Sequence, residues 1–257
     1  MTDYLERLFS LTGRVAVITG GSSGIGRAVS HGLASAGAHV VLIARQQAAL
    51  EETVAELRDA GGHADFVCAD LGDRQALGSA ADRAVASFGE PDILVNCAGV
   101  SIRPPLPNLT MAEWDRTLAV NLTAPFLLGQ RFGPPMAARG WGRIINVVSQ
   151  QAIRAFGNSG GYGASKGGLA SLTRSQSEAW APSGVCCNAV APGFVPTPMT
   201  RDAASDPVRS AALAARTMIG RNGIPADFEG IAVFLASAAC EYVTGQVIFV
   251  DGGFSAS

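Results

Sequence analysis

Three polar side chains in the second half of the chain have the types and spacing needed for proton transfer. Tyr162 and Lys166 are four residues apart, a spacing that places both on one face of a helix. A free phenol has a pKa of about 10, and a nearby ammonium lowers that pKa by stabilising the phenolate. Ser149 ends an apolar run thirteen residues before Tyr162, so its hydroxyl could reach the same substrate oxygen. We therefore expect Tyr162 to exchange a proton with a carbonyl or alcohol oxygen.

A glycine-rich segment near the start of the chain has the composition of a phosphate-binding turn. It links an apolar run at 14–19 to a helical pattern that begins at Gly24. Glycines let the backbone approach a pyrophosphate closely, and a helix N-terminus presents free N–H groups and a positive dipole end. The spacing departs from G-x-G-x-x-G, so a plain strand-to-helix turn is the alternative. The expected dinucleotide contacts are Gly20, Ser22, Ser23, Gly24, Ile25 and Gly26.

The end of the next apolar run indicates which dinucleotide is bound. An acidic residue about 20 positions after the glycines would hydrogen-bond the ribose hydroxyls of NAD. This chain has Ala44 followed by Arg45 there, and a guanidinium binds a 2′-phosphate well. We therefore expect NADP(H) to be favoured over NAD(H). Ser23 stands where a second basic residue would have strengthened this expectation, and a merely solvated Arg45 is the alternative.

These residues need elements that bring them together, and the hydrophobic pattern supplies them. Short apolar runs at 14–19, 39–44, 65–68, 92–96, 142–148, 185–190 and 247–250 alternate with helical patterns at 24–36, 47–60, 74–88, 111–130, 167–180 and 226–239. Such alternation predicts βαβ units, and fully apolar strands predict a parallel sheet covered by helices on both faces. We predict one domain over 1–257 with an α/β, doubly wound Rossmann fold. Ligands of such folds bind beyond the carboxyl ends of the strands.

Composition excludes several classes of protein. Of 257 residues, 48% are hydrophobic and the net charge is −2, so neither disorder nor attraction to nucleic acid or an anionic membrane is expected. The first residues lack a signal-peptide pattern, and no apolar run approaches the ~20 residues that span a bilayer. Five cysteines form no CxxC pair and three histidines show no metal spacing. We expect a cytoplasmic protein with reduced thiols and no metal.

The order and spacing of the motifs resemble the short-chain dehydrogenase/reductase family. The resemblance extends from about Leu11 to Gly253 and includes Thr19–Gly26, Asn96-Cys97-Ala98-Gly99, Asn121, Ser149, Tyr162, Lys166 and Pro192-Gly193. It implies a seven-stranded parallel sheet, NAD(P) binding, and hydride transfer between nicotinamide and a carbonyl or alcohol. It also implies a homo-oligomer, a tetramer or a dimer, with interfaces at 111–130 with 167–180 and at 226–239 with 247–250.

The resemblance also implies a role for each matched residue. Tyr162 would be the general acid/base, Lys166 would lower its pKa and hold the nicotinamide ribose, and Ser149 would orient the substrate oxygen. Asn121 would hold a water that links Lys166 to solvent. Cys97 stands where the family often has a second asparagine. The other implied cofactor contacts are Asp70 and Leu71 near the adenine, Asn96, Ala98 and Gly99 near the adenosine ribose, and Pro192, Gly193, Val195 and Thr197 near the carboxamide.

The substrate is less constrained. Residues 197–221 resemble the family's mobile substrate lid, and 1–10 are expected to be a short flexible terminus. Arg103 and Arg154 each follow a strand and could bind a substrate carboxylate; a solvated arginine is the alternative. The C-terminal half is similar to the gluconate 5-dehydrogenase and 3-oxoacyl-carrier-protein reductase branches. We expect a sugar acid or polyol as substrate, with reduction of a 3-oxoacyl-carrier-protein or another ketone as the alternative. A non-catalytic NADP-sensing protein is the alternative from another class.

Overall fold

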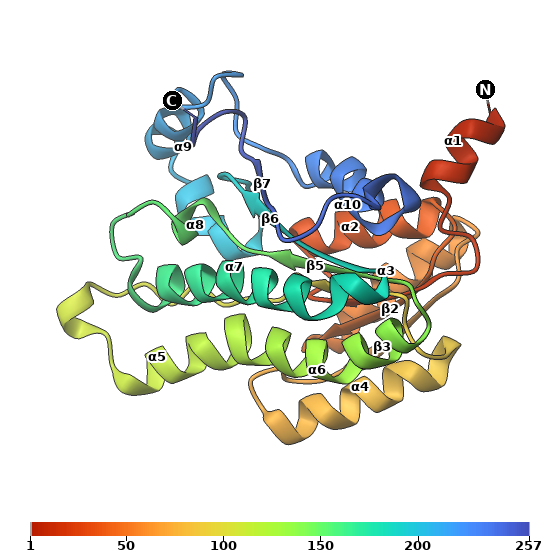
Figure 1. The fold of residues 1–257 in the computed structure, drawn as a ribbon. Helices are drawn as coiled ribbons and strands as arrows, with labels where there is room; N and C mark the ends of the chain where they lie inside the picture. Colours follow the sequence, from red (N-terminus) through yellow and green to blue (C-terminus); the bar gives the residue numbers. More distant parts are fainter. Residues whose placement is uncertain (1, 257) are drawn as a thin grey trace.

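The apolar segments form a single seven-stranded parallel sheet in the computed structural model, which describes residues 2–256 (Figure 1). The strands are β1 (Val15–Thr19), β2 (His39–Ala44), β3 (Ala64–Cys68), β4 (Ile93–Asn96), β5 (Gly142–Val147), β6 (Val185–Pro192) and β7 (Val247–Val250). They lie in the order β3-β2-β1-β4-β5-β6-β7, and each neighbouring pair is parallel. The predicted fold class is confirmed. The order reverses between β1 and β4, which is where such sheets open a crevice for ligands.

Helices cover both faces of the sheet (Figure 1). One face carries α2 (Gly24–Ser35), α3 (Gln47–Asp59) and α10 (Glu229–Ala236), and the other carries α4 (Arg74–Phe88), α5 (Met111–Leu118), α6 (Ala124–Ala138) and α7 (Gly160–Trp180). Leu33 of α2 and Leu235 of α10 belong to the core on the first face, and Leu77 of α4 and Phe132 of α6 to the core on the second. Because both faces are buried, the strands need apolar residues at successive positions.

The predicted helix at 111–130 is interrupted at its centre. A π-helical segment, Ala119–Thr123, separates α5 from α6, and such insertions are frequent at functional sites. Helix α6 then continues to Ala138 through Pro134 and Pro135, beyond the predicted end. The glycine and the two prolines after Gln130 concealed this extension in the sequence.

Helix α7 begins seven residues before the predicted start at 167. Its first turns are rich in glycine, which has low helix propensity. Tertiary packing requires this composition: a Cβ on Gly161 would lie 3.3 Å from Cε3 of Trp114, and one on Gly168 would lie 2.9 Å from Cδ2 of Leu122. The longer helix places Tyr162 and Lys166 one turn apart on the same rigid element.

The terminal segment and the lid region contain short helices. The segment 1–10, expected to be flexible, contains helix α1 (Thr2–Phe9), which ends with Ser10 N–H donating to the Glu6 carbonyl at 2.9 Å and with Leu8 and Phe9 half-buried; its flexibility stays a prediction. Met1 lies outside the described residues. The lid region holds α8 (Arg201–Ala204) and α9 (Pro207–Ala214). The remaining short turns are η1 (Leu106–Asn108), η3 (Gln150–Ala152), η4 (Ala181–Ser183), η5 (Pro198–Thr200), η6 (Pro225–Phe228) and η7 (Ala238–Cys240).

Within residues 2–256, no helix has the length and apolar character needed to cross a bilayer. In the same part of the chain, no three His, Cys, Asp or Glu side chains gather in an arrangement that could hold a metal ion.

Candidate active site

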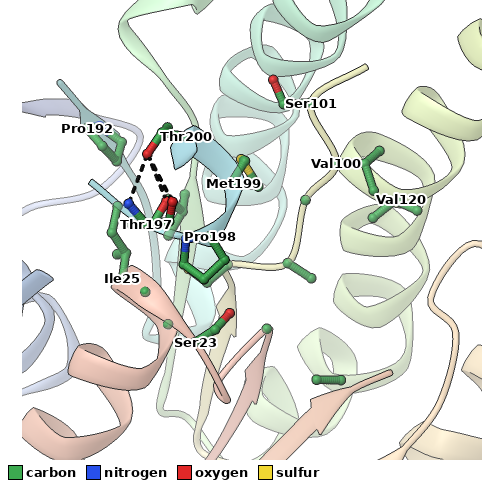
Figure 2. A pocket seen from close by; sticks show the side chains of 18 of the residues that line it. Ser23, Ile25, Val100, Ser101, Val120, Pro192, Thr197, Pro198, Met199 and Thr200 are labelled. Atoms are coloured by element: carbon green, nitrogen blue, oxygen red, sulfur yellow. Dashed lines mark hydrogen bonds between the residues drawn. The ribbon is translucent and has the colours of Figure 1, made fainter. Parts of the chain in front are cut away.

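A cavity of about 520 Å³ lies beyond the carboxyl ends of β1, β4, β5 and β6. Its volume is within the range of about 300–1,000 Å³ common for small-molecule sites. All the cofactor residues predicted from the sequence line it except Asn96, and Ser149 lines it as well. In Figure 2, Ser23 and Ile25 lie near Thr197 and Pro198, and Val100 and Ser101 lie apart from them on another segment of the lining. The glycine-rich segment and the Tyr162 segment therefore meet in one cavity.

The glycine-rich segment turns tightly between β1 and α2. Gly20 has a φ of +69°, and a Cβ there would lie 2.9 Å from the backbone nitrogen of Ala98. A Cβ on Gly26 would overlap the carbonyl oxygen of Gly20. Ser23, the residue before α2, makes no side-chain hydrogen bond to the helix, which leaves the first N–H groups of α2 available to an anion. A pyrophosphate fits this turn.

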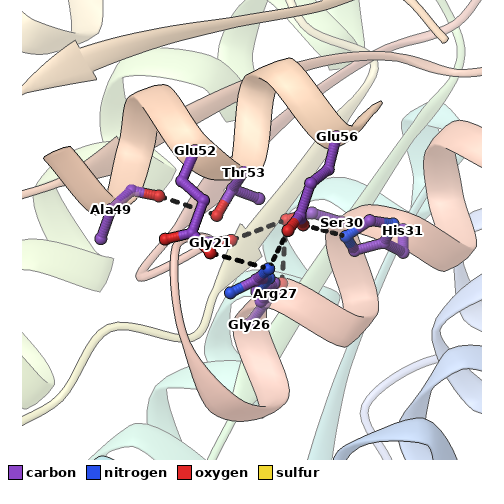
Figure 3. A network of polar contacts seen from close by, with 9 residues as sticks. All are labelled: Gly21, Gly26, Arg27, Ser30, His31, Ala49, Glu52, Thr53 and Glu56. Carbon is purple, nitrogen blue, oxygen red and sulfur yellow. Dashed lines mark hydrogen bonds and ion pairs between the residues drawn. The ribbon is translucent and has the colours of Figure 1, made fainter. Parts of the chain in front are cut away.

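A polar network joins α2 to α3 next to the glycine-rich segment (Figure 3). Arg27 pairs with Glu52 at 3.4 Å and with Glu56, and His31 Nε2 lies 3.3 Å from the second Glu56 oxygen. The bond from Arg27 lowers the pKa of Glu56. The Arg27 guanidinium is thus paired with the carboxylates of Glu52 and Glu56. Arg45, in contrast, lines the cavity, where it can contact a ligand. Arg45 is exposed.

The Ser149, Tyr162 and Lys166 side chains are buried around one end of the cavity. Ser149 is 7% exposed and Tyr162 is 9% exposed. Burial raises the pKa of Tyr162, while a hydrogen bond with Ser149 and the positive charge of Arg103 act in the opposite direction. Arg103 is thus a cation outside the Tyr162–Lys166 pair that lowers the pKa of Tyr162, and the lowering by Lys166 stays a prediction. Ser149 also accepts a bond from the Gln151 N–H at 3.2 Å, which orients its hydroxyl.

The Lys166 ammonium lies beneath the Tyr162 ring. Its Nζ is 5.8 Å from the ring centroid and donates to the Val147 carbonyl at 2.7 Å. Burial lowers the pKa of Lys166 to about 8. The neighbouring Cys97 thiol has a pKa raised by burial to about 11 and is therefore uncharged near neutral pH. Lys166 can thus gain or lose a proton near the pH at which dehydrogenases operate.

Asn121 lies in the π-helical segment and shapes the cavity wall without lining it. Its Nδ2 donates to the Val100 carbonyl at 2.9 Å, and its Oδ1 accepts from the Val100 N–H at 2.8 Å. The same Nδ2 donates to Ser165 Oγ at 3.0 Å, and Ser165 donates to the Tyr162 carbonyl at 2.7 Å. The Asn121 amide therefore holds the loop after β4, at Val100, and the first turns of α7, at Tyr162, in fixed positions relative to each other.

The segment after β6 forms the opposite wall. The Thr200 hydroxyl donates to the Val195 carbonyl at 2.6 Å and accepts from the Thr197 N–H at 2.9 Å (Figure 2). A Cβ on Gly193 would lie 2.8 Å from Cβ of Asp251, so glycine allows close contact with the C-terminal turn. This turn is closed by Asp251, which accepts from the Gly253 and Ser255 N–H groups at 3.0 and 2.9 Å.

Asn96 is absent from the cavity lining, and its predicted place beside the adenosine ribose stays a prediction. It is paired in register with Asn146 of the adjacent strand β5, and its Nδ2 donates to Asn146 Oδ1 at 2.8 Å. Asn146 in turn donates to Thr173 and Gln176 of α7, at 2.9 Å each. Asn96 is the last residue of β4, and its side chain is 2% exposed. It joins the sheet to α7.

The two arginines predicted to bind a carboxylate have different surroundings, and neither lines the cavity itself. Arg103 donates to the Gly157 carbonyl at 3.0 Å, and its charge influences Tyr162. Arg154 donates to the Ser255 carbonyl of the C-terminal turn. Beside it, the Phe156 ring stacks on the Phe254 ring, with the two ring centroids 6.0 Å apart. The geometry therefore disfavours Arg154 as a substrate ligand and assigns it to the C-terminal turn.

Several lining residues were missed in the sequence. Cavity-lining residues outside the predicted set are Ala44, Gln46, Cys97, Val100, Ser101, Val120, Val147, Val148, Pro198, Met199 and Thr200. Most are chain neighbours of predicted residues, so position after a strand was the available signal. Apolar types such as Val120 and Met199 carry no chemical signature, and only the fold shows that they face the cavity.

Comparisons with known proteins agree with this geometry. A family model described as enoyl-(acyl carrier protein) reductase matches residues 20–255. The chain is 40% identical over 247 residues to 2-dehydro-3-deoxy-D-gluconate 5-dehydrogenase of Pseudoalteromonas atlantica, covering 96% of this chain and 97% of the relative. It is 41% identical over 244 residues to cis-4-hydroxycyclohexanecarboxylate dehydrogenase of Sinomonas cyclohexanicum, covering 95% and 97%. A crystal structure of gluconate 5-dehydrogenase from Burkholderia cenocepacia in complex with NADP and tartrate has a TM-score of 0.93 at 38% identity and covers 99% of each chain.

Proposed function

The chain belongs to the short-chain dehydrogenase/reductase family, and on that premise we propose that it is an NADP(H)-dependent oxidoreductase acting on the secondary alcohol or ketone of a sugar acid or polyol. The observation that carries the proposal is the meeting of Ser149, Tyr162 and Lys166 with the glycine-rich turn in one cavity. A nucleotide-sensing protein would need the turn but not these three side chains together. The nicotinamide, when bound, exchanges a hydride with the reacting carbon.

The protein supplies the proton at the substrate oxygen. The Ser149 hydroxyl is near enough to lower the pKa of Tyr162, so a substrate oxygen placed between the two hydroxyls can accept a hydrogen bond from each. During reduction the phenol donates its proton to the developing alkoxide, and during oxidation the phenolate takes the proton from the alcohol. Ser149 stabilises the same oxygen in both directions. Because the two residues are buried, their hydrogen bonds to that oxygen are strengthened by a low local dielectric.

Lys166 and Asn121 support this proton transfer. With a pKa of about 8, Lys166 exchanges protons readily and can restore the protonation of Tyr162 after turnover. Its position on the same helix face as Tyr162 also suits a contact with the nicotinamide ribose. Asn121 holds the Val100 loop and, through Ser165, the backbone of Tyr162. We assign Asn121 a positioning role through these contacts, with the water that links Lys166 to solvent as a second role.

The part of the cavity that would hold the adenosine favours NADP(H) as the cofactor. The first N–H groups of α2, which the Ser23 side chain does not cap, suit a pyrophosphate, and Arg45 lines the cavity at the end of β2, where a carboxylate would favour NAD. Solved structures of relatives carry NADP, including the gluconate 5-dehydrogenase described above. Arg27 is held by Glu52 and Glu56, so the 2′-phosphate is expected to rest on Arg45 and the serines of the turn.

The names of the relatives and one arginine favour an acidic substrate. The two relatives described above are named for carboxylates, and the gluconate 5-dehydrogenase from Burkholderia cenocepacia was crystallised with tartrate, a hydroxy dicarboxylate. Arg103 is close enough to Tyr162 to shift its pKa, and the charge of Arg209 on α9 also reaches Arg103. We assign carboxylate binding to Arg103, with Arg209 brought to the same carboxylate by the lid 197–221.

The assembly is proposed to be a homodimer or homotetramer. Phe126 on α6 is 42% exposed, as is common for an apolar side chain at an interface. It lies in the 111–130 region where the family resemblance places one interface.

The decisive experiment replaces Tyr162 by Phe. Tyr162→Phe removes the hydroxyl alone, so turnover should fall by about 10²–10⁴ fold because general acid–base catalysis contributes about that much. NADPH should still bind with little change in Kd, measured by fluorescence titration. Assays should use sugar acids, polyols, 3-oxoacyl thioesters and cyclic ketones with NADPH and NADH. Near-native turnover by the variant contradicts the mechanism, and binding without turnover of any substrate by the wild-type protein favours a sensor.

A further inference from the structure

The C-terminal turn, residues 251–256, holds a buried aromatic ring that has no part in the proposed mechanism. Phe254 is 2% exposed, and its N–H donates to the Asp251 carbonyl at 3.2 Å. The Asp251 carboxylate also accepts from the Gly253 N–H, at 3.0 Å. Chain ends are poorly ordered unless contacts tie them down. The contacts of this ring therefore indicate what the chain end holds in place.

One neighbour of the ring belongs to the end of the lid. The Arg216 guanidinium carbon lies 4.1 Å from the Phe254 ring centroid, close enough for a cation to be attracted to the ring face. The backbone adds a second contact, because the Ile219 N–H donates to the Gly252 carbonyl at 3.3 Å. A Cβ on Gly252 would lie 2.8 Å from Cγ1 of Ile219, so the lid and the turn pack together without a gap. The end of the lid is therefore fastened to the C-terminal turn.

Another neighbour of the ring belongs to the loop 153–159, which leads from η3 to α7. The Phe156 ring is stacked on the Phe254 ring, with an interplanar angle of 24° and the two centroids 6.0 Å apart, a separation typical of favourable aromatic pairs. In the same loop, the Arg154 guanidinium donates to the Ser255 carbonyl. The C-terminal turn therefore contacts this loop as well as the lid.

The lid and the loop lie apart in the chain but border the same cavity. Residues 197–200 at the start of the lid line the cavity, and so do Ser149 and Tyr162, which the loop connects. We propose that Phe254 is a positioning residue for the substrate, because it fixes the end of the lid and the loop 153–159 to one point. The lid then faces the two catalytic hydroxyls in a defined position. This inference rests on the proposed function.

The place of the turn in the sheet predicts that it acts on the substrate rather than on the cofactor. The C-terminal turn follows β7 at one edge of the sheet, whereas the glycine-rich segment and Arg45 follow β1 and β2, toward the other edge. Removing the Phe254 ring should lower the fraction of molecules in which the lid and the loop are both in place. A site that is competent only in that fraction binds its substrate correspondingly more weakly.

Phe254→Leu is the first test, because it keeps the position apolar and removes the ring. Hydrogen exchange followed by mass spectrometry should become about 5–30-fold faster in peptides from both 207–221 and 153–159, the factor that one or two lost ring contacts correspond to. The KM for substrate should rise about 3–10-fold while the Kd for NADPH changes by less than about twofold.

Arg216→Met and Phe156→Leu separate the two contacts of the ring. Each variant removes one neighbour, so each should accelerate exchange by about 2–5-fold, mainly in its own segment. In a Phe254→Leu background each should add little, because the ring that joins the two segments is already gone. Full additivity of both substitutions in that background would show that the contacts do not act through Phe254, and it overturns the proposal.

Phe132→Leu is the matched control for a loss of stability alone. Phe132 of α6 is fully buried in the core that α4 and α6 form on the second face of the sheet, and it does not line the cavity. Its replacement should lower the free energy of unfolding and leave the KM for substrate and the exchange of both segments unchanged. Unchanged exchange of either segment in Phe254→Leu, or equal acceleration in Phe132→Leu, overturns the proposal. Wild-type protein that turns over no substrate contradicts the proposed function instead, and the exchange rates still decide this one.

Discussion

At the scale of single residues, the protonation of Tyr162 depends on a charged group that the sequence motif does not contain. Burial raises the pKa of its phenol, and the Arg103 charge and the Ser149 hydroxyl counteract that increase. Arg103 is 59 positions from Tyr162 in the chain, so only the fold reveals the pairing. The charge that tunes the proton donor is thus also the charge proposed to bind the substrate carboxylate.

Replacing Arg103 by Met should move the pH dependence of the reaction. Without the cation, the pKa of Tyr162 rises, so the ascending limb of kcat/KM for alcohol oxidation shifts to higher pH. A neutral polyol should be the substrate, because the variant also loses affinity for acids. Arg103→Lys keeps the charge and should keep the profile near that of the wild type. An unchanged profile in Arg103→Met would show that Arg103 does not act on Tyr162.

Arg45 should decide the choice of cofactor. Arg45→Asp removes a charge-assisted contact to the 2′-phosphate and adds a carboxylate that repels it, so the ratio of kcat/KM for NADPH over NADH should fall by about 10–100 fold. Arg83→Asp, on the exposed face of α4, makes the same charge change away from the cavity and should leave the ratio unaltered. Tighter binding of NADH than of NADPH by the wild-type protein would refute the assignment.

At the scale of elements, the tight turn between β1 and α2 tolerates no side chain at Gly26. Gly26→Ala should displace the turn, lower the free energy of unfolding by about 1–3 kcal/mol and weaken NADPH binding. Gly78→Ala in α4 is the control, because a Cβ there meets nothing within 4 Å, and it should raise stability by about 0.5–1 kcal/mol. Urea unfolding and NADPH titration measure both quantities. Equal NADPH affinity in the two variants would contradict the role of the turn.

Elements with a strong periodic pattern were predictable, and those set by tertiary packing were not. The limits of β2 and β7 agree with the predicted runs at 39–44 and 247–250. The start of α7 was missed because glycines that accommodate Trp114 and Leu122 carry no helical pattern. The π-helical segment was missed as well; its Asn121 bonds Val100, a contact between separate parts of the chain that spacing does not reveal.

The residues of the candidate site were likewise predictable where type and spacing define them, and not where contacts between distant parts of the chain do. Residues such as Tyr162 and Gly26 could be placed from motif and position, since their chemistry depends on type and spacing. The contact of Asn96 with Asn146 could not be predicted, because strand register sets it. The contact of Arg154 could not be predicted either, because its partner lies in the C-terminal turn, about a hundred residues later in the chain.

At the scale of the whole molecule, the exposed part of α6 should hold copies of the chain together. Phe126→Glu places a charge where the interface is proposed, and light scattering after gel filtration should show a shift from a dimer or tetramer toward the mass of one chain. Val208→Glu is the control, because Val208 is 80% exposed on α9, outside both proposed interfaces. A monomeric wild-type protein would exclude the assembly, and an unchanged mass for Phe126→Glu would exclude this interface.

The C-terminal turn has a practical consequence for anyone who modifies this protein. Its residue Asp251 packs on Gly193 of the cavity wall, and the Arg216 guanidinium lies 4.1 Å from the ring centroid of the neighbouring Phe254. A purification tag or surface linker joined at the carboxyl end would press on the lid and the cavity wall together. Helix α1 lies at the other side of the molecule (Figure 1), so the amino end is the better point for attaching or immobilising the enzyme.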